Sequence, residues 1–473
     1  MKKFYITTPL YYVNDKPHLG HSYTTIAADV LARYYRARSG DAFLLTGTDE
    51  HGSKIEEASL KHGSTPVEWA DSIVGNFKGL WKRLNISYDD FIRTTEPRHI
   101  KKVQEVFAKL LESGDIYKGR YSGWYCVSCE AFCADAQVID GKCPDCARQV
   151  SLVEEESYFF KLSKYQDKII EHYEKNPDFL KPSWRAAEMK NFVKSGLKDL
   201  SVSRTQVKWG IPVPGDEKHT IYVWFDALLN YLSASEGRDI WPCDIHFVGK
   251  EIFKFHTVIW PAILMALGVT LPKTVFAHGW WTVNGEKMSK SKGNFVDPNV
   301  FIDKYGCDAY RYFVLRQIPF GQDGDFSESC LLERYNSDLA NNLGNLVSRT
   351  LSMMSKYGLK NLRASSGSGT PIGAAVSAFA PKFYLAMENA EFGAALSHIW
   401  EIINITNKTI DSEKPWALAK SDPKKLEQVM SDILSALVLI ADNLRFFMPE
   451  TSDRIKKILE CGEVSEPLFP RLQ

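Results

Sequence analysis

The chain has 473 residues, of which 44% are hydrophobic and 25% are charged, and these are ordinary values for a globular protein. Its 58 Lys and Arg residues balance 58 Asp and Glu residues, which excludes a general attraction to polyanions as the basis of any contact with nucleic acid. No apolar run approaches the roughly 20 residues of a membrane span, and the N-terminus lacks the apolar core of a signal peptide. We therefore expect a cytoplasmic protein without membrane contact, and its length indicates about two to four domains.

The first predicted element is a strand over Phe4–Thr8, which Pro9 ends, and a helix is predicted from Gly20 to Arg38. The turn His18-Leu19-Gly20-His21 leads into this helix. A strand, a tight turn with glycine and a helix N-terminus form a site where backbone N–H groups and the helix dipole receive phosphate. The two histidines add hydrogen-bond donors, and Gly20 leaves room for a flat base. Taken alone, the turn fits metal binding or helix capping equally well.

A buried strand is predicted over Ala42–Thr46, and Asp49 stands in the polar turn that follows it. Open parallel sheets bind ligands at the carboxyl ends of their strands, so Asp49 is a candidate binding residue. A solvated turn aspartate is the alternative. Helices are predicted over Trp69–Leu84 and His99–Ser113, and this alternation indicates the first half of a Rossmann-like α/β domain with a parallel sheet.

Five of the nine cysteines fall in one short segment of small aromatic strands and turns. Four of them form two C-x-x-C pairs separated by 13 residues, Cys126 with Cys129 and Cys143 with Cys146. Four thiolates at this spacing match a structural, tetrahedral zinc site, which would hold an insertion that has little core of its own. An odd number of cysteines without a secretion signal argues against a disulfide framework. Cys133 is a surplus thiol that we expect to stay outside the ligand set.

Beyond this insertion, His219–Asp226 is predicted to be a strand and Ala227–Tyr231 the start of a helix. A further strand is predicted over Ile245–Lys250, with Glu251 at its carboxyl end. The helix predicted over Phe253–Leu267 carries His256 and Trp260 on one face, because they are four residues apart. Each of these aromatic residues, taken singly, is more typical of an ordinary core than of a pocket.

A strand over Val275–Gly279 precedes the segment Lys287-Met288-Ser289-Lys290-Ser291-Lys292-Gly293-Asn294. The Asn284-Gly285 pair ahead of this lysine loop predicts a small hairpin. Three lysines, two hydroxyls and a glycine suit a flexible loop that closes over a triphosphate. A solvated basic surface turn is the alternative.

From Leu331 onward the pattern is nearly all helical, over 334–356, 374–388, 392–411 and 426–447, which indicates an antiparallel helical bundle. Asn345 and Arg349 share one helix face, and Trp416 stands at a helix start. Asparagine and arginine offer donors to base edges, and tryptophan offers a plate on which an unstacked base can stack. An exposed arginine and a core tryptophan are the alternative.

The turn His18–His21 and the loop Lys287–Ser291 together resemble the two signature motifs of class I aminoacyl-tRNA synthetases, and the resemblance runs over nearly the whole chain. Its details are similar to the methionyl-tRNA synthetase family, in the form with a single zinc knuckle. The resemblance implies an α/β fold in which a zinc-bearing insertion splits a Rossmann-like parallel-sheet catalytic domain, followed by an all-α helical bundle. The implied ranges are 1–115 and 216–270 for the two catalytic halves, 116–215 for the connective insertion, 271–330 for the stem-contact region with the lysine loop, and 331–473 for the anticodon-binding bundle.

The resemblance also implies the roles of single residues. The catalytic residues are His18, His21, Lys287 and Lys290. ATP is contacted by Gly20, Gly249, Glu251, His278, Gly279, Met288, Ser289 and Ser291, with Glu251 on the ribose hydroxyls. Methionine is held by Pro9, Leu10, Tyr12, Asp49, Trp224, Ala227, Leu228, Tyr231, Ile252, His256 and Trp260, with Asp49 on the ammonium group. The CAU anticodon is read by Asn345, Arg349 and Trp416, and one structural Zn²⁺ per chain is bound by Cys126, Cys129, Cys143 and Cys146.

The implied activity is ATP-dependent ligation of methionine to its tRNA, the initiator tRNA included, through a methionyl-adenylate, with Mg²⁺ accompanying ATP. Some relatives carry a further dimerising domain, so the end of the chain at Gln473 implies a monomer. Synthetases for isoleucine, valine or leucine normally need a long editing insertion, for which this length leaves no room. The cysteine enzyme would need an open zinc site near its pocket. A non-catalytic tRNA-binding relative would have no use for the intact histidines and lysines.

Overall fold

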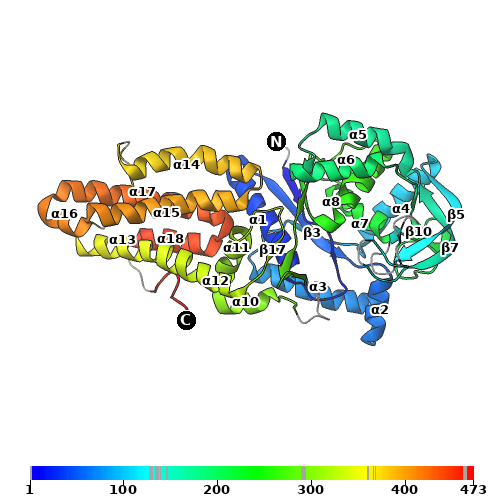
Figure 1. Cartoon of the computed structure of the whole chain (residues 1–473), viewed down its shortest axis with the longest axis horizontal. Coiled ribbons are helices and arrows are strands. Elements are labelled where there is room, and N and C mark those ends of the chain that lie inside the picture. The colour runs from blue at the N-terminus through cyan, green and yellow to red at the C-terminus, as the bar shows by residue number, and fades with distance from the viewer. Residues whose placement is uncertain are drawn as a thin grey trace. The chain divides into compact units, whose positions relative to one another are not determined.

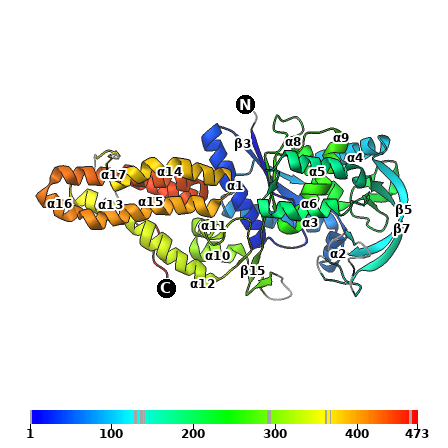
Figure 2. The same ribbon diagram turned by 45° about the horizontal axis from the view of Figure 1, so that its top comes forward.

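The computed structural model describes residues 3–126, 131–133, 138, 140–144, 147–288, 294–359, 362–365, 367, 369–461 and 466–473. The chain divides into two compact units, each assembled from three separate segments. Unit 1 comprises residues 1–17, 41–79 and 88–277, and unit 2 comprises residues 18–40, 80–87 and 278–473. Figures 1 and 2 show the two units in two views.

Unit 1 is built on a seven-stranded sheet in which β1 (Phe4–Thr7) is central and fully buried at Tyr5 and Ile6. The strands follow the order β2-β3-β1-β13-β14-β8, and β4 pairs with β3. The pairings of β1 with β3 and β13, of β3 with β2 and β4, and of β14 with β8 are all parallel, which confirms the predicted parallel sheet. The other strands are β2 (Tyr11–Tyr12), β3 (Ala42–Asp49), β4 (Asp90–Arg93), β8 (Leu180–Lys181), β13 (Ile245–Gly249) and β14 (Thr274–His278).

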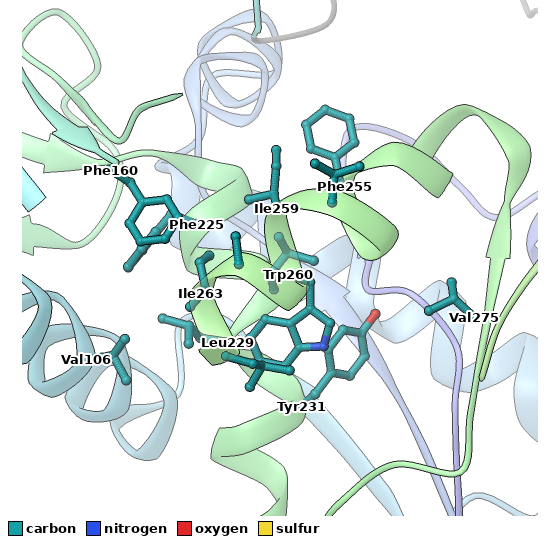
Figure 3. Packing of buried hydrophobic residues seen from close by; sticks show 14 of the residues in the cluster. Val106, Phe160, Phe225, Leu229, Tyr231, Phe255, Ile259, Trp260, Ile263 and Val275 are labelled. Atoms are coloured by element: carbon teal, nitrogen blue, oxygen red, sulfur yellow. The ribbon is translucent and has the colours of Figure 1, made fainter. Parts of the chain in front are cut away.

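Helices of unit 1 bury apolar faces against this sheet and against each other. In α4 (Pro97–Glu112) the residues Val103, Val106, Phe107 and Leu110 recur at helical spacing and are buried. Figure 3 shows the centre of this core, where Tyr231 and Trp260 lie side by side. The other helices are α2 (Ser53–Lys61), α3 (Pro66–Arg83, which ends in unit 2), α5 (Gln166–Lys175), α6 (Ala186–Lys194), α7 (Val223–Leu228), α8 (Asn230–Ser235) and α9 (Trp260–Leu267).

The region predicted to be an insertion contains a four-stranded antiparallel sheet with the order β6-β5-β7-β9. The predicted short strands are wrong for its two main members, because β5 (Ile116–Cys126) and β7 (Ser151–Phe160) pair continuously from Ile116 opposite Phe160 to Tyr125 opposite Ser151. A three-stranded sheet follows. The remaining strands are β6 (Ala131–Cys133), β9 (Leu200–Ser201), β10 (Ser203–Arg204), β11 (Pro212–Val213) and β12 (Asp216–Ile221).

The strand predicted over His219–Asp226 is only half correct. Strand β12 ends at Ile221, and α7 begins at Val223. The aromatic and β-branched residues favour a strand locally, but Asp226 is fully buried and held by side chains from other elements, and such tertiary contacts override β-propensity.

The helix predicted over Phe253–Leu267 also differs from the prediction. A 3₁₀ turn (Lys250–Ile252) and a π-helix (Phe255–Ile259) precede α9. Pro261 has no N–H to donate to the carbonyl of Thr257 one turn earlier, and that carbonyl instead accepts a hydrogen bond from the hydroxyl of Tyr173 at 2.7 Å. The wide π turn therefore accommodates the proline. Such π turns are frequent at functional sites.

Unit 2 is almost entirely helical, as predicted for the C-terminal region. Figures 1 and 2 show α13, α14, α15 and α17 running alongside one another. The helix start predicted at Trp416 is confirmed by α16, whereas α18 was not predicted. A small sheet completes the unit, with β16 (Glu286–Lys287), β15 (Trp281–Val283) and β17 (Gly324–Asp325) in that order. Its helices are α1 (Leu19–Ser39), α10 (Pro298–Tyr305), α11 (Cys307–Arg316), α12 (Glu328–Arg334), a π-helix (Tyr335–Gly344), α13 (Asn345–Lys356), α14 (Pro371–Glu388), α15 (Phe392–Glu413), α16 (Pro415–Ser421), α17 (Pro423–Phe447) and α18 (Pro449–Cys461).

A buried ion pair fixes α1 within unit 2. The side chains of Asp29 and Arg311 are both fully buried and lie 2.7 Å apart. Arg311 also donates to the main-chain carbonyls of Leu84, Phe446 and Phe447. Because every polar atom of the pair is hydrogen-bonded, the charge on Asp29 is tolerated in the core. Burial alone would raise the pKa of Asp29, but the guanidinium groups of Arg311 and Arg33 help to hold it below the ordinary value.

None of the helices in the described ranges is long and apolar enough to cross a membrane.

Candidate functional site

Aromatic side chains next to the carboxyl end of β13 form a cluster in unit 1, which we call the aromatic slot because the sequence predicts the methionine site there. Tyr231 on α8 is fully buried, and its ring centre lies 5.8 Å from those of both His256 and Trp260. The indole of Trp224 stacks on Phe255 at 3.8 Å and meets His256 edge-on. The prediction that His256 and Trp260 share one face is confirmed, because both rings approach Tyr231. The slot therefore combines apolar, polarisable walls with one hydroxyl and one imidazole.

Hydrogen bonds define the tautomer of His256. Its Nδ1 lies 3.0 Å from the carbonyl oxygen of Ile252, which can only accept, so Nδ1 carries a proton. Burial lowers the pKa of His256 to about 4, so the ring is neutral at physiological pH and Nε2 is an acceptor. The hydroxyl of Tyr231 consequently donates to Nε2 at 2.8 Å.

The turn after β3 forms a second part of the site. Asp49 is the last residue of β3 and pairs with Tyr12 of β2. Glu50 is fully buried and accepts two hydrogen bonds from Arg93, at 2.7 and 2.9 Å. The hydroxyl of Tyr12 donates to the carbonyl of His51 at 2.9 Å. The turn that carries Asp49 is thus held rigidly from both sides.

Other predicted slot residues lie in the same unit. Leu228 is buried in its main core, against which Leu10, Tyr12, Trp224 and Ile252 pack. Ala227 and Pro9 are buried as well. Gly249 ends β13, and a Cβ there would lie 2.6 Å from a carboxylate oxygen of Glu251, so glycine provides the space for that side chain.

The histidine turn belongs to unit 2, where it caps α1. The backbone N–H of Gly20 donates to Nδ1 of His18, and the backbone N–H of His18 donates to Nδ1 of His21, each at 3.0 Å. The two residues form a capping box, so the capping alternative considered from the sequence is correct. A Cβ at Gly20 would lie 2.9 Å from Cε1 of His18, so this glycine makes room for the imidazole.

Capping also determines what these rings can donate. Both Nδ1 atoms accept from the main chain, which places the proton of each neutral ring on Nε2. The rings stack at 3.9 Å, and burial together with the neighbouring His18 keeps the pKa of His21 well below its ordinary value. At the positive end of a 21-residue helix, two neutral N–H donors suit a phosphate oxygen.

The predicted hairpin is confirmed. Strands β15 (Trp281–Val283) and β16 (Glu286–Lys287) are antiparallel, and the turn residues Asn284 and Gly285 have φ angles of 55° and 74°. The N–H of Gly285 and the hydroxyl of Thr282 donate to Asp325, and these bonds hold the pKa of that carboxyl below its ordinary value. Met288 is half-buried, but Ser289, Lys290 and Ser291 lie outside the described residues, as does the side chain of Lys287.

The segments on both sides of the lysine loop contact α1 within unit 2. After the loop, the carbonyl of Val296 accepts from the N–H of Leu19 at 3.2 Å, and Phe295 meets His18 edge-on. Before it, Nε2 of His278 lies 2.7 Å from the hydroxyl of Thr24. A Cβ at Gly279 would lie 2.2 Å from the carbonyl oxygen of Gln322, so only glycine fits there. The structure therefore places the residues that flank the lysine loop against α1 and its histidine turn.

Comparisons with known proteins identify the family. A family model described as "tRNA synthetases class I (M)" matches residues 4–152 and 148–351. The chain belongs to this family of class I tRNA synthetases. It is 51% identical to the methionine--tRNA ligase of Caldanaerobacter subterraneus subsp. tengcongensis over 99% of its length, and 48% identical to that of Thermotoga maritima over 96%. It covers 75% and 74% of these two relatives.

Solved structures agree with this assignment. The methionyl-tRNA synthetase of Mycobacterium tuberculosis in complex with methionyl-adenylate is 37% identical to the chain, with a TM-score of 0.94 and full coverage of both chains. The apo form of the Mycobacterium tuberculosis enzyme is 34% identical, with a TM-score of 0.87 and coverage of 100% of this chain and 99% of that one.

The cysteine segment of the synthetase is described in part. Cys126, Cys133 and Cys143 are buried in one small cluster, whereas Cys129 and Cys146 lie outside the described residues. Within the described ranges, no three His, Cys, Asp or Glu side chains form a group that could hold a metal. The Sγ atoms of Cys133 and Cys143 are 3.8 Å apart, about the sulfur–sulfur separation in a tetrahedron with zinc–sulfur bonds of about 2.3 Å. Cys133 therefore lies in contact with the predicted ligand Cys143, which is closer than expected.

The predicted anticodon residues lie in the helical bundle of the synthetase. Asn345 is exposed, and the guanidinium of Arg349 forms an ion pair with Asp411 at 2.7 Å. Trp416, in the first turn of α16, is 46% exposed, so the alternative of a core tryptophan is wrong. Asp411 belongs to the last turn of α15 and so connects Arg349 to the helix end that precedes Trp416.

The sequence reasoning missed three buried side chains beside the slot. His51 and His99 both bind the carboxylate of Asp226, at 2.7 Å each. The separations of 175 and 127 residues, respectively, leave no local pattern that would reveal the cluster. The one available signal was the polar Asp226 within an otherwise apolar run, since a buried carboxylate needs partners.

Proposed function

We propose that this chain is a methionine--tRNA ligase that activates L-methionine with ATP and transfers it to tRNA, releasing AMP and pyrophosphate. The main support is the aromatic slot with its neutral His256–Tyr231 pair, in a chain that matches over its full length a synthetase solved with methionyl-adenylate. A thioether is apolar and polarisable and accepts hydrogen bonds only weakly, so aromatic walls suit it. Asp49 at the end of β3 is the proposed partner of the substrate ammonium group.

In the first step, the methionine carboxylate attacks the α-phosphorus of ATP, and pyrophosphate leaves. The carboxylate is already ionised at neutral pH, so no general base is required, and the protein has to align the reactants and stabilise charge on the phosphates. We assign His18 and His21 to the phosphates because their Nε2–H groups donate while the rings stay neutral. Glu251 is assigned to the ribose, and the terminal adenosine of tRNA then attacks the activated carbonyl.

Lys287 and Lys290 are proposed to close over the triphosphate and the departing pyrophosphate. Lys290→Ala should lower the rate of adenylate formation by about two to three orders of magnitude, because a charge that contacts the transition state is lost, while methionine binding changes little. Pre-steady-state adenylate formation, with methionine affinity measured by equilibrium dialysis, tests this. An unchanged rate would remove the lysine loop from the mechanism, and Lys273→Ala on the surface is the matched control.

Metals enter the proposal in two places. The thiols of Cys126, Cys129, Cys143 and Cys146 are proposed to hold one structural zinc, which would stabilise the insertion. Mg²⁺ is expected to bind with ATP and to neutralise phosphate charge.

The remaining expectations concern partners and organisation. We propose that elongator and initiator tRNA(Met) are both charged, with Asn345, Arg349 and Trp416 reading the anticodon. We also propose that the protein is a cytoplasmic monomer, and that its functional domains follow the ranges 1–115, 116–215, 216–270, 271–330 and 331–473.

One assay tests the activity. Pyrophosphate exchange with ATP, measured across the 20 amino acids, should depend on methionine, and charging of tRNA(Met) should follow. Exchange with another amino acid would indicate a different class I specificity. Binding of tRNA without any exchange would indicate a non-catalytic protein.

A further inference from the structure

A buried cluster lies next to the aromatic slot of unit 1 and consists of His51, His99 and Asp226, which we call the His–Asp–His cluster. Nδ1 of His51 lies 2.7 Å from one carboxylate oxygen of Asp226, and Nε2 of His99 lies 2.7 Å from the other. Asp226 and His99 are fully buried, and His51 is 5% exposed. Nδ1 of His99 is 2.9 Å from the hydroxyl of Ser233.

The cluster joins three elements that surround the slot. His51 follows β3, and its carbonyl accepts from the hydroxyl of Tyr12 at 2.9 Å. Asp226 lies on α7 between the slot residues Trp224 and Ala227. His99 lies in α4, which packs against α8, the helix of Tyr231. A single carboxylate thus connects the Tyr12 wall of the slot with the Trp224–Ala227 wall.

We propose that Asp226 is a positioning residue for methionine, and that through His51 and His99 it sets the separation of the two walls of the aromatic slot. This inference rests on the proposed function. None of the three side chains belongs to the slot residues assigned above, so the cluster acts on the substrate only through Tyr12, Trp224 and Ala227.

The cluster requires a carboxylate at position 226 because both imidazoles present a donor to it. An asparagine has almost the same shape, but its amide offers one acceptor oxygen and one N–H₂ group. The imidazole that faces the N–H₂ group would have to change tautomer in order to accept from it, and the hydrogen bonds to a charged carboxylate would be replaced by weaker neutral ones. The attachment of α7 to the β3 turn or to α4 would loosen as a result. The change is local, since the apolar packing of Phe225 and Leu228 is untouched.

The first experiment measures methionine-dependent pyrophosphate exchange by Asp226→Asn, with rates normalised to titrated active sites. We expect the KM for methionine to rise about tenfold, as expected for the loss of one hydrogen bond to a charged group, with the KM for ATP and the kcat changing much less. The control is Asp115→Asn in the same unit. Asp115 is 4% exposed and accepts from Lys164, Tyr165 and Ser113, but it does not touch the slot. The Asp115→Asn variant should have a lower thermal stability than the wild type and an unchanged KM for methionine.

The second experiment exploits the two different ring nitrogens. The amide nitrogen of asparagine takes the place of a histidine Nδ1, and that of glutamine takes the place of Nε2. Because His51 binds Asp226 through Nδ1 and His99 binds it through Nε2, His51→Asn and His99→Gln should keep a KM within about threefold of the wild type. His51→Gln and His99→Asn should raise it about tenfold.

The reciprocal preference shows that the hydrogen bond matters and the size of the imidazole does not. Thermal denaturation of the same variants separates positioning from bulk stability, because a merely structural role would lower stability and leave the KM for methionine unchanged. Equal effects of the two amides at both positions, or an unchanged KM for methionine in Asp226→Asn, would overturn the inference while leaving the proposed function intact. A wild-type protein without methionine-dependent exchange would overturn both.

Discussion

Single side chains in the core of unit 1 are held in the neutral state by burial. Burial lowers the pKa of His256 to about 4 and that of His246 well below its ordinary value. The hydroxyl of Tyr231, whose own pKa burial raises, can therefore keep donating to His256 over the whole physiological range. The polar end of the slot is chemically constant, and its neutral donors and acceptors match an uncharged thioether.

The histidine at position 256 should make stability depend on pH. Its pKa is about 4 in the folded protein and near 6.5 when unfolded, so between these values the unfolded chain binds a proton that the folded chain does not. The free energy of unfolding should therefore be fully maintained above pH 6.5 and should fall by about 3 kcal/mol as the pH drops toward 4. Urea denaturation of the wild type and of His256→Asn at several pH values measures this contribution.

In the asparagine variant the fall should be smaller by that amount, because the other buried histidines are common to both proteins. Identical pH profiles would show that this ring does not titrate as proposed.

For single residues, the sequence predicts which side chains are candidates for the site better than it predicts which side chains contact each other. The slot residues could be named because the sequence resembles a known family, and the approach of His256 and Trp260 to Tyr231 confirms that these two rings share one face. The pairing of Asp226 with His51 and His99 could not be named, because it depends on how three distant elements pack. Similarly, the exposure of Trp416 depends on the packing of α16, which local spacing does not determine.

Among the elements, α1 is a well-buried helix, with 13 of its 21 residues removed from solvent. Its N-terminus carries the paired histidines, and its centre is attached to α11 by Asp29 and Arg311. The boundaries of α1 were predictable from the turn at its start and from Ser39-Gly40 at its end. The π-helix before α9 was not predictable, because it depends on a contact between distant elements. The hydroxyl of Tyr173 donates to the carbonyl of Thr257, which Pro261 leaves without a donor.

Removal of Arg311 should destabilise the element it holds. Arg311→Met should lower the free energy of unfolding by about 3–5 kcal/mol, because the Asp29 carboxylate would stay buried without its main counter-charge. Arg33→Met is the control, since Arg33 also pairs with Asp29 but is 20% exposed, and it should cost about 1 kcal/mol. Urea denaturation of both variants provides the comparison, and equal losses would contradict the argument from burial.

The cysteine insertion should depend on zinc. Chelation should open the cluster around Cys126 and Cys143, because four thiolates supply much of what holds so small a core. Amide hydrogen exchange should show lost protection in β5 and β7, while methionine binding is affected less.

The zinc content should fall from one per chain to near zero in Cys143→Ser and stay unchanged in Cys133→Ser. Loss of zinc in the latter would place Cys133 among the ligands.

Over the whole molecule, the proposed chemistry is divided between the two units. Unit 1 contains the aromatic slot, the β3 turn and the His–Asp–His cluster. Unit 2 contains the capping histidines, the hairpin of the lysine loop and the bundle with Trp416. The fold class was predictable because alternating strands and helices indicate an α/β domain, and the later run of helices indicates a helical bundle. The assignment of α1 to unit 2 was not predictable, since the strands that precede and follow it in the sequence, β1 and β3, belong to unit 1.

This division predicts variants that separate the two reactions. Trp416→Ala should raise the KM for tRNA by about 5- to 150-fold, corresponding to a lost base-stacking contact of about 1–3 kcal/mol, with no effect on methionine-dependent pyrophosphate exchange. Aminoacylation kinetics beside exchange kinetics test this, with the exposed Trp184→Ala of unit 1 as the control. An equal loss in both reactions would show that Trp416 supports the fold and does not contact RNA.

The ion pair of Asp29 with Arg311 has a consequence for biosynthesis. Translation delivers α1 among the first segments, but its counter-charge emerges 282 residues later, and the α17 carbonyls that complete the site follow later still. Throughout that interval the nascent helix presents an apolar surface whose central carboxylate has only Arg33 as a counter-charge, without the buried partner that lets it enter the core. The ribosome-bound chain should therefore be a client of holding chaperones until the final quarter of its synthesis, and α1 should be the segment to which they bind.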